Sequence, residues 1–143
     1  MAHTLTKIDH MKKISFLLVL FVAMIASSAK SQTKFENWPA LGSIHDVISA
    51  TFHPSEKGNF DPIKQRSGEL ADKAVALSKS VVPAQYNKPE VKAAVKELLN
   101  KSTELNQLVM KKAKDDKLNK SLIAVHDAFH KIVGLCTDEK EHH

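Results

Sequence analysis

Cysteine is nearly absent from the sequence, since Cys136 is the only one among 143 residues. An internal disulfide is therefore impossible, and the lone thiol can only stay free, bridge to another chain or bind a metal. Glycine is also scarce, and its four copies are isolated, so the chain has no glycine-rich loop that could cradle phosphate groups. Paired carboxylates and a Ser-His-Asp arrangement are missing too. We therefore expect no catalytic activity.

A strong excess of charge of one sign is missing as well. The whole chain has 21 basic and 16 acidic residues, but residues 1–31 hold four of the lysines and one aspartate. The remaining 17 basic and 15 acidic residues leave a net charge of +2, and the two signs are interspersed. Such a balance does not indicate a nucleic-acid groove, so no nucleic-acid partner is expected.

Residues 1–31 are expected to be a leader with a cleavable signal peptide. After ten residues that resemble an extended start, two lysines precede an apolar run at 14–25 and a small-residue exit, with cleavage after Ala29 or Ser31. The apolar run is shorter than the roughly 20 residues of a membrane span. A periplasmic or secreted protein is therefore predicted, with no stable membrane association once the signal is removed.

Residues 32–143 are expected to form one domain with a short polar C-terminal tail. No segment alternates with period two, so no strand is predicted. Four segments carry apolar residues at helical spacing: Trp38–Phe52, Asp61–Val81, Pro89–Val109 and Leu118–Val133. Four amphipathic helices with short connections predict an all-α, up-down-up-down antiparallel four-helix bundle.

The first of these helices has recognisable ends. Asn37 is the expected N-cap, and Pro39 falls in the first turn, where proline is tolerated. The run HPSEKGNFDP contains two prolines and a glycine, which predicts that the helix has ended by His53. His53 is therefore expected in a loop.

The run SLIAVHDAFHKIVGLC places His126 and His130 four residues apart on the fourth helix. Histidines at this spacing share one helix face and can chelate a single transition metal. Both border the apolar stripe, as does His45 on the first helix. In an antiparallel bundle, counting levels along the first and fourth helices pairs His45 with His126, or with His130 after a shift of one turn. The three imidazoles predict a zinc or copper site.

Further ligands could complete such a site. Asp72 and Glu104 fall near the same level on the second and third helices, although surface charge is their usual role. Cys136 and the terminal His142 could join the first site or form a second one. His53 lies eight residues after His45, about 12 Å along a helix axis, and is a weaker candidate than His45.

The segment His126-Asp127-Ala128-Phe129-His130 is similar to the H-E-x-x-H motif of zinc peptidases, in which glutamate is the general base. Asp127 replaces that glutamate, and its shorter side chain would place the carboxylate differently. A bundle of this size also offers no evident substrate cleft. A metal-binding protein is therefore favoured over a peptidase.

The helix pattern and the histidine of the fourth helix resemble the exported four-helix-bundle cytochromes, the b-type bundle proteins and cytochrome c-prime. The resemblance implies a haem, but the C-x-x-C-H motif of covalent attachment is missing around Cys136. The methionine that b-type bundles use near the start of their first helix is missing too. A b-type haem for electron transfer would need His45 with His126 or His130 as paired axial ligands. The other alternative is a structural or interaction bundle without metal.

Overall fold

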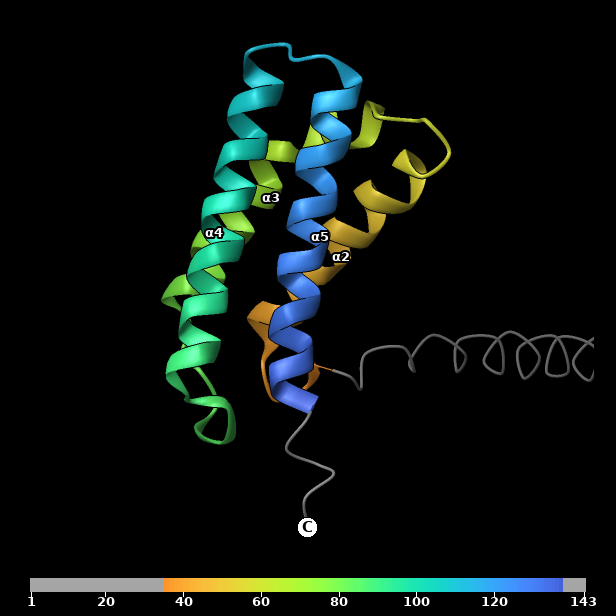
Figure 1. The fold of residues 1–143 in the computed structure, drawn as a ribbon. Helices are drawn as coiled ribbons and strands as arrows, with labels where there is room; N and C mark the ends of the chain where they lie inside the picture. The colour runs from red at the N-terminus through yellow and green to blue at the C-terminus, as the bar shows by residue number, and fades with distance from the viewer. Residues whose placement is uncertain (1–34, 138–143) are drawn as a thin grey trace, which may run out of the picture. The chain divides into compact units, whose positions relative to one another are not determined.

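The structure, a computed structural model, describes residues 35–137, and its regular elements there are all helical (Figure 1). In chain order they are α2 (Pro39–Ser55), α3 (Asp61–Lys79), the 3-10 helix η3 (Ala84–Tyr86), α4 (Pro89–Met110) and α5 (Asp115–Thr137). No strand occurs within residues 35–137. The predicted all-α class with four main helices is confirmed. The predicted signal peptide and His142 lie outside the described residues.

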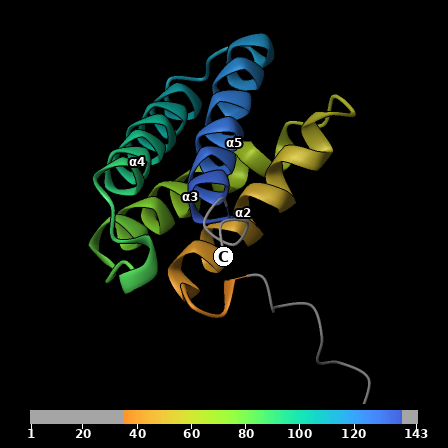
Figure 2. The ribbon, with the colours of Figure 1, turned by 60° about the horizontal axis from the view of Figure 1, so that its bottom comes forward.

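The four helices pack into a bundle around one core. Each helix contacts the next one along the chain, and α2 also contacts α5. The α4–α5 contact is the most extensive of these, and the α2–α5 contact is the smallest. Figures 1 and 2 show the reason, because α4 and α5 lie side by side whereas α2 crosses α5 at an angle. The α2–α5 seam is therefore the most open side of the bundle.

The core consists of the apolar stripes that the helical spacing predicts. Each helix contributes large apolar side chains to the core. Examples at most 1 % exposed are Ile44, Ile63, Leu98 and Phe129. Burying a side chain of this size contributes about 1.5 to 3 kcal/mol, so these stripes hold the helices together. Among residues 35–137 no helix is long and apolar enough to cross a membrane.

Prolines mark where three of the helices begin. Pro39, Pro62 and Pro89 each occupy the first or second helical position, where their missing N–H has no partner to lose. The prediction of Asn37 as N-cap is wrong, because Trp38 holds that position and no side chain caps the helix. Trp38 is buried instead, and its indole Nε1 donates a hydrogen bond of 2.9 Å to Ser80 Oγ.

Helix α2 continues beyond its predicted end. Pro54 lies inside the helix, in its last turn, and the loop expected at His53 is therefore a correction. The carbonyl of Phe52 accepts the N–H of Glu56 at 3.2 Å and also a hydrogen bond of 2.6 Å from the Ser55 hydroxyl. Gly58, with φ +78°, then reverses the chain in the left-handed conformation that glycine accepts readily.

Helix α4 ends in a similar reversal, but a lysine occupies the left-handed position. Lys112 has φ 53°, and its N–H donates to the Val109 carbonyl at 2.9 Å. The N–H of Ala113 reaches the Leu108 carbonyl at 3.0 Å, so the two bonds make a Schellman motif. A residue with a Cβ in this conformation costs about 1 kcal/mol relative to glycine.

Candidate metal centre

His126 and His130 face each other across one turn of α5. Their two Nε2 atoms lie 3.1 Å apart. Two nitrogens bound at about 2.0 to 2.1 Å to one tetrahedral zinc ion stand roughly 3.3 to 3.4 Å from each other. The pair is therefore already close to the separation of two ligands on a single ion.

The ring of His126 is held in this orientation by a residue of α2. Phe52 stacks on it with 3.9 Å between ring centroids and 10° between ring planes. The side chain of His126 is 26 % exposed, so it sits partly covered at the seam and not freely in solvent. Its Nδ1 lies 3.5 Å from a carboxylate oxygen of Asp127. A carboxylate on the Nδ1 side favours the proton there and leaves the Nε2 lone pair for a metal.

His45 of α2 lies close to Phe129, the residue before His130. The rings of His45 and Phe129 have centroids 5.3 Å apart, and Phe35 lies at the same distance on another side of His45. The level counting pairs His45 with His126, or with His130 after a shift of one turn. In the structure Phe52 is the α2 residue that stacks on His126, and His45 lies beside Phe129, which contacts His130. This arrangement reflects the crossing of α2 over α5, which a parallel alignment of helix axes ignores.

His53 occupies the last turn of α2, next to Phe52. Its ring centroid lies 6.0 Å from that of Phe52, and its side chain is 67 % exposed. Nδ1 of His53 is 3.0 Å from a carboxylate oxygen of Glu56, the residue that follows the last residue of α2. The contact holds the ring by Nδ1, which again directs the Nε2 atom outward.

The remaining candidate ligands are not joined to these histidines. Asp72 on α3 and Glu104 on α4 are exposed, and Cys136 is buried near the end of α5. Within residues 35–137, no three His, Cys, Asp or Glu side chains are close enough together to hold a metal ion. The structure thus brings His126 and His130 together, and places His45 and His53 beside the two phenylalanines that contact that pair.

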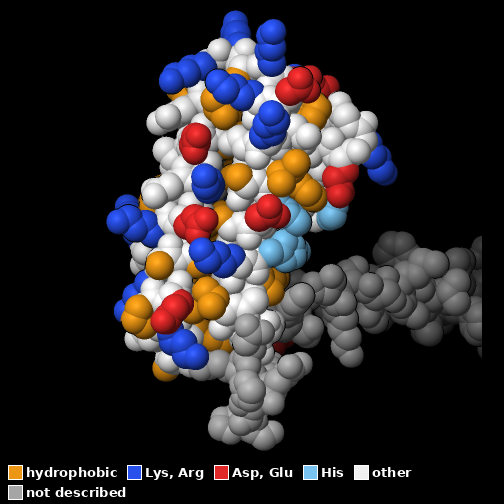
Figure 3. All heavy atoms as spheres, viewed as in Figure 1, with side chains coloured by type: hydrophobic (Ala, Val, Ile, Leu, Met, Phe, Trp, Pro, Cys, Tyr) orange, Lys and Arg blue, Asp and Glu red, His pale blue; other side chains and the backbone are white. Residues whose placement is uncertain are grey.

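The histidine side chains are also grouped on the surface of the protein. Figure 3 shows histidine side chains gathered over α5 and the neighbouring part of α2, with acidic side chains next to them. Neighbouring carboxylates lower the free energy of a bound cation and fix imidazole tautomers. A transition-metal ion would therefore meet nitrogen ligands within a locally acidic surface.

Two aromatic residues of this site were not singled out as functional by the sequence pattern. Phe52 and Phe129 each follow the apolar spacing of their helix, which is the signal of a core residue. Phe129 is indeed buried, while Phe52 is partly exposed and stacked on His126. Their position in the sequence could have singled them out, since Phe52 precedes His53 and Phe129 precedes His130.

No protein family model, curated protein or solved structure matches this chain. Its function must therefore be argued from the histidines and their surroundings.

Proposed function

We propose that this protein is an exported metal-binding four-helix bundle without catalytic activity. It binds one zinc or copper ion through His126 and His130, with His45 as the third ligand. Export is supported by the signal-like run at residues 11–31. The helices are proposed to alternate in direction as an up-down-up-down antiparallel bundle. The contacts between successive helices, and between α2 and α5, support that topology.

One observation carries the metal proposal, namely the 3.1 Å between Nε2 of His126 and Nε2 of His130. Two neutral imidazoles gain at most one hydrogen bond from this approach, since one must act as donor and the other as acceptor. A metal ion uses both lone pairs together. The chelate is also prepared in advance, because both ligands share one helix and Phe52 holds one ring in place.

The same geometry supports a bare ion better than a haem. Paired axial ligands of a haem lie on opposite faces of the porphyrin, whereas His126 and His130 approach from one helix at 3.1 Å. A haem would need His45 opposite one of them, with room for its plane between α2 and α5. Phe52 covers one ring face of His126, and Phe129 is packed in that seam against His45.

The third ligand is assigned to α2 because a two-histidine site is weak and α2 supplies the nearest further imidazoles. His45 is half-buried, with 43 % of its side chain exposed, and its Nδ1 lies 3.9 Å from Asp46. A partly buried ring loses less freedom on binding than the more exposed ring of His53. His45 would have to turn toward the pair on binding, because the structure does not bring three ligands together within residues 35–137.

Isothermal titration with zinc and with copper(II) tests the proposal. The titration is done in a background where the two terminal histidines, His142 and His143, are alanine, so that the tail adds no ligand. We expect one ion per chain. His126→Ala and His130→Ala should each weaken binding more than about a hundredfold, because losing a metal ligand costs more than losing a residue that only orients one.

A matched control removes a carboxylate that has no contact with the pair. Glu104→Gln on α4 changes one exposed acid and should leave the affinity within about twofold. Chelator should lower the melting temperature of the metal-loaded protein and should leave that of His126→Ala unchanged. Absence of binding by the background protein, or equal binding by all variants, would contradict the proposal.

A further inference from the structure

Lysines are concentrated at the end of the bundle where α4 turns into α5. Five of them line an open hollow at this turn, together with a single acid, Asp116: Lys111, Lys112, Lys114, Lys117 and Lys120. The neighbouring Asp115 is already engaged, since its carboxylate forms a salt bridge of 2.7 Å with Lys64 of α3. The turn therefore carries a local excess of positive charge that the nearly balanced sequence as a whole conceals.

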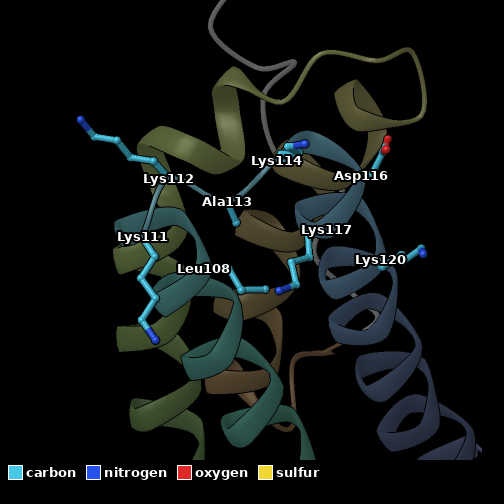
Figure 4. A pocket seen from close by; sticks show the side chains of 8 residues that line it. All are labelled: Leu108, Lys111, Lys112, Ala113, Lys114, Asp116, Lys117 and Lys120. Atoms are coloured by element: carbon cyan, nitrogen blue, oxygen red, sulfur yellow. The ribbon is translucent and has the colours of Figure 1, made fainter.

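The lysines spread over this end and do not converge on a point. Figure 4 shows Lys117 reaching toward Leu108 between the helices, while Lys111, Lys112 and Lys120 point outward in different directions. Figure 3 shows the same gathering of basic side chains at this end of the molecule. Outward, separated ammonium groups suit an extended anionic surface better than one small anion.

Apolar side chains lie among these charges. Met110, at the end of α4, is 74 % exposed, and Leu108 and Ala113 line the hollow. Exposed apolar groups with lysines around them are the chemistry of an interface between lipid headgroups and acyl chains.

The conformation of Lys112 adds an independent argument. It occupies a left-handed position, with φ 53°, that glycine fills at the corresponding end of α2. A long charged side chain at such a position is unfavourable for stability alone. A lysine at this position is explained if its positive charge takes part in binding.

We propose that the α4–α5 turn docks reversibly on the phosphate-rich surface of an anionic lipid bilayer. The lysines that point outward contact lipid phosphates, Lys117 adds its positive charge from within the hollow, and Met110 enters the headgroup layer. Clusters of four to eight basic residues bind anionic membranes in this way, and the attraction falls off within a Debye length. Such docking is salt-sensitive and peripheral, and it would hold the proposed metal site away from the membrane surface, on the α2–α5 face.

Vesicle co-sedimentation of the full chain tests this docking. Vesicles contain phosphatidylcholine alone or with about one-third phosphatidylglycerol, and the leader contributes equally to every protein compared. The triple variant Lys111→Gln, Lys114→Gln, Lys117→Gln is compared with wild type. We expect its affinity for the anionic vesicles to fall at least about tenfold, because each lysine near the surface contributes separately.

The matched control removes the same number of charges elsewhere, in Lys57→Gln, Lys92→Gln, Lys96→Gln, all exposed in the structure. This variant should stay within about twofold of wild type, and the difference between the two variants should vanish at about 0.5 M salt. Equal losses in both variants would overturn the proposal, as would no loss in the first. Binding of soluble polyglutamate that depends on Lys114 and Lys117, without vesicle binding, would also overturn it in favour of an acidic protein.

Discussion

Helix α5 contacts α4 and α2 through different kinds of side chain. The α4–α5 seam is extensive, and an ion pair of 2.7 Å between Lys131 and Glu97 crosses it. The α2–α5 seam is less extensive and includes several contacts between aromatic rings and histidines, such as Phe52 on His126. The tighter seam is a structural contact, and the more open one carries the histidines of the proposed metal site.

Metal binding at the proposed site would affect the two seams differently. A ligand from α2 and a chelating pair on α5 would add a link where the helices contact each other least. Binding to the folded state alone stabilises a protein by an amount that grows with ligand concentration over Kd. The α2–α5 seam is therefore where a metal ion could change the packing of the bundle, and the α4–α5 seam should respond little.

The largest effect is expected from emptying the α2–α5 seam. Phe129 is 1 % exposed and contacts the rings of Phe35 and His45. Phe129→Ala should lower the free energy of unfolding by about 3 to 5 kcal/mol, measured by urea denaturation. Ile123→Ala on the same helix, at a position 41 % exposed, should cost about 1 kcal/mol or less. Similar losses in both variants would show that the seam is not part of the core.

The next largest effect is expected on zinc affinity when the proposed third ligand, on α2, is removed. His45→Ala should weaken zinc binding about tenfold, because a half-buried ligand would be lost while the chelating pair remains. His53→Ala should weaken it about twofold or less, since His53 is more exposed and already held by Glu56. The titration described above measures both. A larger loss with His53→Ala would move the third ligand to the last turn of α2.

A smaller effect is expected at the α4–α5 turn, where Lys112 has φ 53°. Lys112→Gly should raise the free energy of unfolding by about 0.5 to 1 kcal/mol, because glycine relieves the left-handed conformation. Lys111→Gly is the control, since Lys111 has φ −81° and gains nothing from glycine. Thermal or urea unfolding should give opposite signs for the two variants, and a loss of stability in both would contradict the assignment.

The smallest effect concerns the α4–α5 ion pair. The hydrogen bond and charge of Lys131 lower the pKa of Glu97, so the pair favours the folded state above the ordinary carboxyl range. That contribution is lost as the pH falls through the lowered pKa of Glu97. Lys131→Gln should return this pKa toward its ordinary value, measured by carboxyl carbon NMR. The pKa of Glu69, which Arg66 lowers on α3, should stay where it is.

Much of the fold follows from local chemistry. Prolines at the first turns of α2, α3 and α4 predict where these helices begin, and the apolar spacing predicts which faces are buried. The end of α2 was mispredicted because Pro54 was treated as a helix breaker. In the structure it lies in the last turn, one residue before the helix ends, and the N–H of Glu56 still reaches the Phe52 carbonyl. A proline this close to a helix end removes one backbone hydrogen bond and need not stop the helix before it.

The site was predictable only in part. Spacing alone places His126 and His130 on one face, and the structure brings their Nε2 atoms to 3.1 Å. The level of His45 relative to α5 depends on the angle at which α2 crosses, which is set by the packing of large side chains such as Phe52 and Phe129. A one-dimensional count of levels carries no information about that angle.

The central claim is that one ion is held by Nε2 of His126 and Nε2 of His130. Long-range proton–nitrogen NMR correlations of the histidine rings during a zinc titration test it most directly, because each ring nitrogen is observed separately. The account predicts that both Nε2 resonances move together and saturate at one zinc per chain, while both Nδ1 atoms keep their protons. It would be contradicted if zinc shifted only the ring nitrogens of other histidines and left those of His126 and His130 unchanged.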